Sequence, residues 1–186
     1  YLVVDAVHQV GAVNTDLSQI HVDILTAGGH KWLNSPYGCG FLYVNKEIVK
    51  QLKPVFWGYL NLGEPEGGWP AYFGTPSITP VRDWEFVETA RKFEIGGTSN
   101  YAGAIALGES LTLFNELGIE NVEKHNVELA DYLIEGLKEV GATLITRPEP
   151  GHRSALVVFR FYKDIKEENE LLKELHKNNV YVAMRF

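Results

Sequence analysis

The chain of 186 residues is poor in sulfur and in positive charge. Its one cysteine, Cys39, excludes an intramolecular disulfide framework and a cysteine-based zinc cluster, and is typical of a reducing, cytoplasmic location. Lys and Arg number 17 against 24 Asp and Glu, so the net charge of −7 argues against nucleic-acid or anionic-membrane partners. No apolar run reaches the roughly 20 residues of a membrane-spanning helix, and no basic and apolar leader opens the chain. The histidines show no paired metal-ligand spacing, so no metal is expected.

What the chain does have is enough apolar material for a sizeable core, since 45% of its residues are hydrophobic and 22% are charged. Both ends are apolar: Leu-Val-Val follows Tyr1, and residues 180–186 are mostly β-branched and aromatic. Natural termini are usually polar and frayed. We therefore expect a fragment of a longer chain, with part of any active site outside these residues.

Short apolar runs alternate with amphipathic stretches along the chain. Strands are expected at residues 2–4, 22–26, 41–44, 143–146, 154–161 and 180–183, and helices at 46–52, 101–117, 119–140 and 167–177. Residues 57–84 are expected to form a long irregular loop, which holds three of the four tryptophans. Short strands without strict alternation suit a mostly parallel sheet with helices on both faces, so the predicted fold class is α/β.

Three short segments carry the candidate chemistry. Asp5 ends the first strand, at the edge where open α/β sheets bind ligands, although a turn-capping aspartate is the common alternative. Lys31 lies in Gly-Gly-His-Lys-Trp after the second strand, where partial desolvation favours Schiff-base chemistry; a solvated loop lysine is the alternative. Gly97 and Thr98 precede a helix and offer N–H and hydroxyl donors to an anion, but a plain helix cap explains them equally well.

Together, these groups match the requirements of pyridoxal 5'-phosphate. A carboxylate keeps the pyridine nitrogen protonated, a lysine forms the imine, and a hydroxyl-bearing helix start holds the phosphate.

The same residues carry a resemblance to the class V aminotransferase family. Residues 4–11 (Val-Asp-Ala-Val-His-Gln-Val-Gly), 29–33 (Gly-His-Lys-Trp-Leu), 37–44 and 93–98 look like segments of that family, which includes cysteine desulfurases and isopenicillin N epimerase-like proteins. The resemblance implies a fold-type-I enzyme with Lys31 as the cofactor lysine and Asp5 at the pyridine nitrogen. It further implies that His8 contacts the phenolic oxygen, His30 lines the pocket, and Gly97 and Thr98 serve the phosphate of the neighbouring subunit in a homodimer.

From this resemblance we expect a pyridoxal-phosphate-dependent aminotransferase, in which Lys31 moves a proton at the α-carbon of an amino-acid substrate. A cysteine desulfurase or epimerase-type enzyme is the alternative within the family, and a structural α/β module is the non-enzymatic one. Residues 1–120 are assigned to part of the cofactor-binding large domain, and residues 121–186 to part of a small C-terminal domain. The isolated fragment is expected to be inactive.

Two residues depart from the family pattern. Gly28 stands three residues before the lysine, where members commonly carry a Ser or Thr that binds phosphate, so a backbone N–H or Thr26 would have to substitute. Cys39 lies between glycines at a strand start, where a small or branched apolar residue is usual. We interpret this cysteine as a packing residue rather than a nucleophile.

Overall fold

The computed structural model describes residues 1–75, 79, 81, 83–147, 149 and 151–185. The chain divides into two compact units, each described by itself below. The first contains Tyr1–Gly11 and Thr15–Glu116, and the second contains Ala12–Asn14 and the residues from Leu117 onward. The predicted domain boundary at residue 120 stays a prediction.

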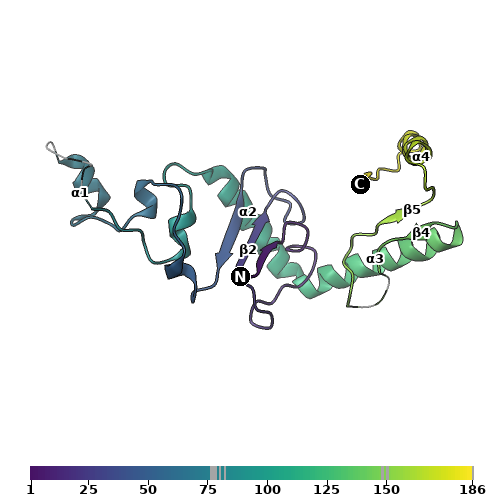
Figure 1. The fold of residues 1–186 in the computed structure, drawn as a ribbon, viewed down its shortest axis with the longest axis horizontal. Coiled ribbons are helices and arrows are strands. Elements are labelled where there is room, and N and C mark those ends of the chain that lie inside the picture. The colour runs from purple at the N-terminus through teal and green to yellow at the C-terminus, as the bar shows by residue number, and fades with distance from the viewer. Residues whose placement is uncertain (76–78, 80, 82, 148, 150, 186) are drawn as a thin grey trace. The chain divides into compact units, whose positions relative to one another are not determined.

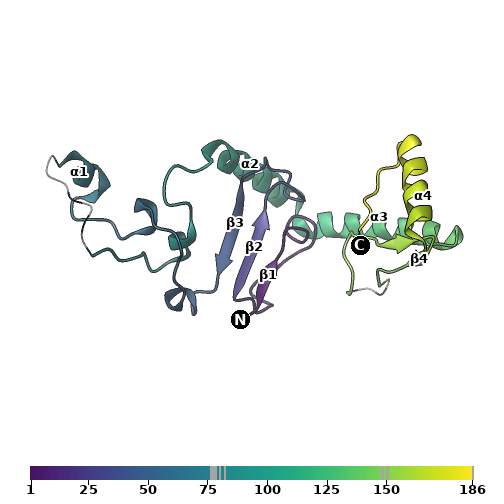
Figure 2. The same ribbon diagram turned by 45° about the horizontal axis from the view of Figure 1, so that its top comes forward.

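The first unit is built on a three-stranded sheet, whose strands lie side by side in Figure 2. β1 (Val3–Asp5) pairs in parallel with β2 (Ile24–Gly28), and β2 pairs in antiparallel fashion with β3 (Gly40–Val44). The connection between β2 and β3 is too short for the helical crossover that parallel strands require, so β3 returns as an antiparallel neighbour. The second strand begins at Ile24, two residues later than predicted.

The core of this unit consists of two apolar clusters that include residues of β2 and β3. One contains the buried residues Ala6, Val22, Leu25 and Ala27, and the other contains Val44, Ile48 and Val49. Burial of such side chains stabilises the fold by about 25 cal/mol for each Å² of apolar surface removed from water.

Between the sheet and the next long helix, the chain forms short helical segments (Figure 1). They are η1 (Val49–Gln51), η2 (Tyr59–Asn61), α1 (Gly68–Gly74) and η3 (Ala90–Phe93). The prediction of a helix over 46–52 was wrong beyond the single turn of η1. The prediction of an irregular loop over 57–84 was wrong at η2 and α1, although residues 76–78, 80 and 82 of that range lie outside the described residues.

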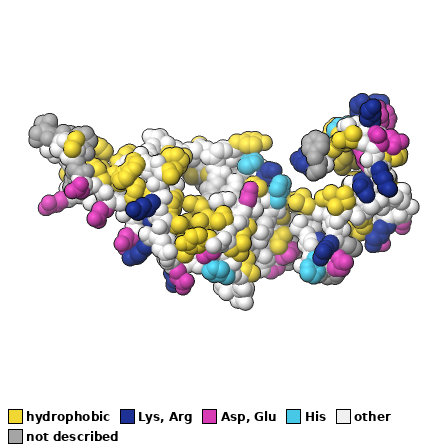
Figure 3. All heavy atoms as spheres, in the orientation of Figure 1, with side chains coloured by type: hydrophobic (Ala, Val, Ile, Leu, Met, Phe, Trp, Pro, Cys, Tyr) yellow, Lys and Arg dark blue, Asp and Glu magenta, His cyan; other side chains and the backbone are white. Residues whose placement is uncertain are grey.

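α1 is held by aromatic contacts rather than by an apolar stripe of helical period. The rings of Tyr59, Trp69, Tyr72, Phe73 and Trp84 pack with centroids 5.5–5.7 Å apart. Figure 3 shows hydrophobic side chains gathered on the surface of the part that carries α1. Aromatic pairs in stacked and edge-on geometry are each worth about 0.5–1.5 kcal/mol beyond the area they bury.

Two buried polar side chains connect η2 and η3 to their neighbours. Asn61 is fully buried and donates from Nδ2 to the Glu94 carbonyl at 2.8 Å. Lys92 is 5% exposed, and its Nζ donates to the Val49 carbonyl at 2.6 Å and lies 5.4 Å from the centre of the Phe93 ring. Each hydrogen bond offsets part of the cost of burying its polar group.

Two long helices follow, and the sequence predicted both. α2 (Tyr101–Leu117) has its expected bounds, and α3 (Ile119–Glu139) ends one residue early. Gly118 and Gly141 adopt positive φ angles of 77° and 79°, which end a helix without the strain a side chain would add. None of the described helices is long and apolar enough to span a membrane.

The second unit combines α3 with a two-stranded antiparallel sheet and α4 (Ile165–Lys177). The sheet pairs β4 (Thr143–Leu144) with β5 (Phe159–Arg160), both much shorter than predicted. No strand forms over 180–183 among the described residues. The loop prolines at 148 and 150 lie outside the described residues. A strand needs a partner ladder, and β4 supplies one only to residues 159–160.

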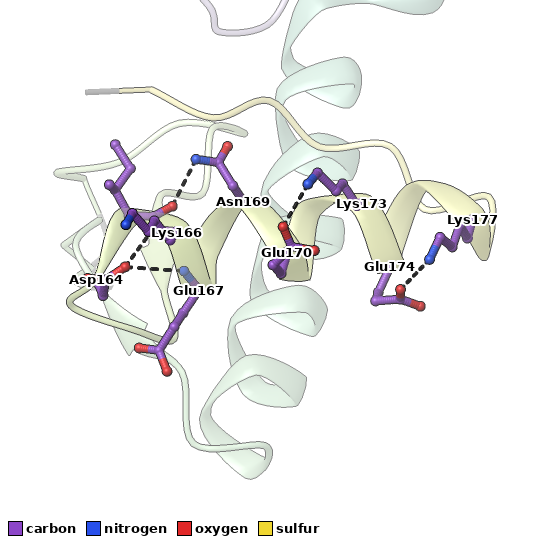
Figure 4. Close-up of polar contacts among 9 residues, drawn as sticks. Asp164, Lys166, Glu167, Asn169, Glu170, Lys173, Glu174 and Lys177 are labelled. Atoms are coloured by element: carbon purple, nitrogen blue, oxygen red, sulfur yellow. Dashed lines mark hydrogen bonds and ion pairs between the residues drawn. The ribbon is translucent and has the colours of Figure 1, made fainter.

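α4 begins two residues before its predicted start, because Asp164 caps it. Asp164 Oδ1 accepts hydrogen bonds from the backbone N–H of Lys166 and Glu167. Figure 4 shows this cap together with the Lys173–Glu170 and Lys177–Glu174 ion pairs one turn apart along the exposed helix. Glu167 and Glu168 lie in the first turn of α4, where negative charge favours the helix dipole.

Candidate active site

Asp5 and Thr26 occupy paired positions of two parallel strands, so the carboxyl ends of β1 and β2 meet at one edge of the sheet. The Asp5 side chain is exposed there, and its Oδ1 accepts a hydrogen bond from the Val7 N–H at 3.1 Å. This hydrogen bond is the one expected of a turn-capping aspartate, the alternative interpretation of Asp5 in the sequence analysis. It leaves the carboxylate at the edge where ligands bind in open α/β sheets.

The segment between β2 and β3, residues 29–39, carries Lys31 and is called the lysine loop below. Its backbone closes on itself: Gly29 N–H donates to the Cys39 carbonyl at 2.8 Å, and Ser35 N–H donates to the Gly29 carbonyl at 2.9 Å. Asn34 adopts a φ of +50°, and its N–H donates to the Lys31 carbonyl at 3.0 Å. These bonds fix the shape of the loop around an exposed lysine side chain.

Lys31 and His8 meet at the candidate site. Lys31 Nζ lies 2.9 Å from His8 Nε2, and both side chains are exposed. An ammonium group donates to a neutral imidazole nitrogen, so the two groups can share and pass a proton. No ion pair to a carboxylate involves Lys31 among the described residues.

Gly11 allows the segment that carries His8 to approach the lysine loop. A Cβ on Gly11 would lie 2.8 Å from the backbone carbon and oxygen of Trp32, and its φ of +89° is itself unfavourable for other residues. The backbone at residue 11 therefore packs directly on the residue that follows Lys31.

His30 occupies the space beside Gly28. Its ring stacks on Tyr37 with centroids 5.0 Å apart, and a Cβ on Gly28 would lie 2.8 Å from His30 Cε1. A serine or threonine at position 28 would displace this imidazole. The departure from the family pattern at Gly28 thus has a steric explanation in this chain.

Gly97 and Thr98 lie in the segment that precedes α2, and Thr98 is exposed. A Cβ on Gly97 would meet no atom within 4 Å, so the backbone there faces open space. Asn100 caps the helix, because its Oδ1 accepts from the Gly103 N–H at 2.9 Å. Within the described residues no hydrogen bond joins Thr98 to Asp5, His8 or Lys31.

Cys39 is a half-buried free thiol at the end of the lysine loop, where its carbonyl accepts the Gly29 hydrogen bond. Its interpretation as a packing residue stays a prediction. Among the described residues, no group of three His, Cys, Asp or Glu side chains is arranged to hold a metal ion.

Three residues at the site were given no role in the sequence analysis: Tyr37 beneath His30, Gly11 against Trp32, and Ser110 of α2. Ser110 Oγ donates to the Leu33 carbonyl, which lies two residues after Lys31. Gly11 belongs to one of the motif segments, but the sequence does not show that it contacts the lysine loop.

Comparison of the sequence with known proteins identifies the family of this chain. The family model described as aminotransferase class-V matches residues 1–184. A probable cysteine desulfurase of Synechocystis is 34% identical over 160 residues, which cover 85% of this chain and 34% of the relative. The isopenicillin N epimerase of Streptomyces clavuligerus is 31% identical over 166 residues, which cover 85% of this chain and 38% of the relative. The chain thus spans about a third of the length of these relatives.

A solved structure agrees at the level of the fold. The structure of a lysine-to-alanine mutant of C-DES, with glycine covalently linked to its PLP cofactor, matches with a TM-score of 0.73 and 20% sequence identity. The match covers 95% of this chain and 42% of that one. The α/β arrangement described above is therefore part of the fold-type-I architecture, as the resemblance implied.

Proposed function

Because this chain belongs to the class V aminotransferase family, we propose that it carries half of the active site of a pyridoxal-phosphate-dependent enzyme that acts on an amino acid. Our first choice of reaction is amino-group transfer to a 2-oxo acid. The observation that carries the proposal is the pairing of Lys31 Nζ with His8 Nε2 at 2.9 Å, at the sheet edge that also presents Asp5.

The residues present fit this cofactor. Lys31 is an exposed amine that is hydrogen-bonded to an imidazole rather than paired with a carboxylate, so it is available to bond to an aldehyde. Asp5 is an exposed carboxylate at the same edge, suited to pair with a protonated pyridine nitrogen. When bound, pyridoxal phosphate supplies an electron sink for bonds broken at the substrate α-carbon.

In this proposal each of the candidate site residues has a defined role. Lys31 would hold the cofactor and move a proton at the substrate α-carbon, while His8 would orient the lysine and contact the phenolic oxygen. Asp5 keeps the pyridine nitrogen charged, and His30 lines the pocket on its support of Tyr37. Gly97 and Thr98 present backbone and hydroxyl donors to the phosphate of a neighbouring subunit.

The test of Lys31 is made on the full natural polypeptide that carries these residues. With pyridoxal phosphate added, the protein is expected to show a visible absorbance band, and borohydride is expected to fix the cofactor on the peptide that contains Lys31. Lys31→Ala removes the amine and is expected to abolish both signals, whereas Lys53→Ala, an exposed lysine of the same unit, leaves them intact. A band that survives in Lys31→Ala would disprove the role of this lysine.

Sulfur removal from cysteine is the second candidate, and the 34% identity to a probable cysteine desulfurase favours it. Epimerisation follows from the 31% identity to an isopenicillin N epimerase. Incubation of the loaded protein with amino acids, a 2-oxo acid acceptor and a thiol reductant separates the three. A new 2-oxo acid formed from the amino acid indicates aminotransfer, sulfide together with alanine from cysteine indicates desulfuration, and inverted configuration at the α-carbon without either product indicates epimerisation. A full-length protein that never takes up the cofactor would favour a structural α/β module.

We also propose that the protein is a cytoplasmic homodimer. The single cysteine supports a reducing location, and the resemblance of residues 93–98 to the family segment that serves a neighbouring subunit's phosphate supports the dimer.

A further inference from the structure

The lysine loop is attached to α2 at two points. Ser110 Oγ donates to the Leu33 carbonyl, and Asn100 Nδ2, in the helix cap, donates to the Tyr37 carbonyl at 3.4 Å. The two donors are ten positions apart in the sequence, about 15 Å along the helix axis. Both attachment points, Leu33 and Tyr37, follow Lys31 in the lysine loop. The loop is therefore anchored to α2 near the middle of the loop and again near the end of the loop.

The Ser110 hydrogen bond is not the usual one for a helical serine. Hydroxyls inside helices commonly bond to the carbonyl four residues earlier in the same helix. Thr112, two residues away, does so with the Gly108 carbonyl at 3.1 Å. Ser110 instead directs its hydroxyl out of the helix to a backbone group 77 residues away in sequence.

The receiving end of this hydrogen bond lies in a packed part of the loop, because Leu33 is 2% exposed. A backbone carbonyl in such a place needs a protein partner, and Ser110 supplies it. Trp32, the residue before Leu33, is in contact with the backbone of Gly11 from the segment that carries His8. Consecutive residues after Lys31 are thus held from two elements, with Gly11 at residue 32 and Ser110 at residue 33.

We propose that Ser110 is a positioning residue for Lys31. By holding the Leu33 carbonyl, it fixes the lysine loop so that Nζ stays within hydrogen-bond distance of His8 Nε2. The inference rests on the proposed function, in which Lys31 is the cofactor lysine. Without the Ser110 hydroxyl, the Leu33 carbonyl loses its partner, and the loop gains alternative positions in which lysine and imidazole separate.

The experiment compares variants of the full natural polypeptide. Ser110→Ala removes the hydroxyl, and Ser110→Thr and Ser110→Val form a pair of nearly equal shape that differs in having or lacking it. Thr112→Ala is the matched control, because it removes a hydroxyl that bonds within the same helix. Thermal unfolding of every variant shows which proteins are folded.

Two quantities are measured. The first is the dissociation constant of pyridoxal 5'-phosphate, followed by absorbance, which is expected to rise about three- to ten-fold in Ser110→Ala and Ser110→Val. The second is the pH profile of acetylation of Lys31 by acetic anhydride in the cofactor-free protein, read by peptide mass spectrometry. That profile is expected to shift in the same two variants, and to stay at the wild-type position in Ser110→Thr and Thr112→Ala.

The outcomes separate this inference from the proposed function. If wild-type protein takes up no pyridoxal phosphate, the proposed function fails, while the acetylation profile still tests the coupling of Ser110 to Lys31. If Ser110→Val matches Ser110→Thr in both measurements, or if Thr112→Ala shows the same changes, Ser110 does not position Lys31. Should Ser110→Ala not fold, the Thr and Val pair decides alone.

Discussion

At the scale of single residues, glycines decide how closely the parts of the candidate site approach one another. Gly11 brings a backbone into direct contact with Trp32, and Gly28 leaves room for the His30 imidazole. A side chain at either position would fill space that the site uses. The geometry of the site therefore requires that positions 11 and 28 carry no side chain.

Gly11→Ala tests this dependence. The new Cβ would lie 2.8 Å from backbone atoms of Trp32 in a residue with a φ of +89°, so we expect a loss of about 1–3 kcal/mol in the free energy of unfolding. Urea unfolding of the full natural polypeptide measures it. Gly74→Ala is the control, because a Cβ there meets no atom within 4 Å. Equal stability of the two variants would contradict the close contact.

At the scale of elements, the two long helices were predictable because their signals are local. Gly118 and Gly141 end α2 and α3 at positions that the sequence marks directly. The strands were harder, because a strand exists only where a distant partner supplies hydrogen bonds. Residues 154–158 have the composition of a strand and yet lie outside the ladder that β4 forms with residues 159–160.

α1 and the Ser110 contact show two further limits of sequence reasoning. α1 is a seven-residue helix held by contacts among aromatic rings, some of which belong to residues outside the helix. Its sequence therefore has no apolar pattern of helical period from which the helix could be predicted. The Ser110 hydrogen bond joins positions 110 and 33, and nothing in either local sequence points to the other. By contrast, Lys31, His8 and Asp5 could be proposed as site residues from the sequence, because they lie in segments that resemble motifs of the family.

The attachment of β1 has a predicted pH dependence. The Leu2 N–H donates to Asp23 Oδ2 at 2.6 Å, and this hydrogen bond, with help from nearby His21, holds the pKa of Asp23 below its ordinary value of 3.8. A carboxyl whose pKa is lowered on folding stabilises the folded state above its unfolded pKa. That stability is lost as the pH falls through the lower, folded pKa.

Thermal unfolding from neutral pH down to about pH 2 measures this effect. Asp23→Asn is expected to lower the midpoint near neutral pH and to flatten its decline in acid. Glu116→Gln removes an equal charge at an exposed position of α2 and serves as the control. A variant at Asp23 with the wild-type decline would show that this carboxyl does not anchor β1.

At the scale of the whole molecule, the proposed homodimer predicts complementation between defective subunits. Thr98→Ala is expected to weaken pyridoxal phosphate binding, and Lys31→Ala to abolish the covalent bond. In a mixed dimer, the site on the Thr98→Ala subunit keeps its own lysine and receives Thr98 from the other subunit. Half of the sites in such dimers therefore regain wild-type affinity.

Absorbance titration of the refolded mixture measures the recovered sites. A mixture of Lys31→Ala with Lys31→Ala/Thr98→Ala is the control, because it contains no subunit with the lysine. If Thr98 serves its own subunit instead, mixing restores nothing and the proposed contact between subunits is wrong.

The buried position of Lys92 has a consequence for the chemistry of the whole protein. Its amine is enclosed against the Val49 carbonyl and the Phe93 ring, whereas Lys31 stands in solvent. Reagents that attack amines will therefore reach Lys31 in the native state and reach Lys92 only after the surrounding segments have opened. The chain thus contains an internal reporter of its own unfolding, located in the same unit as the lysine proposed for catalysis.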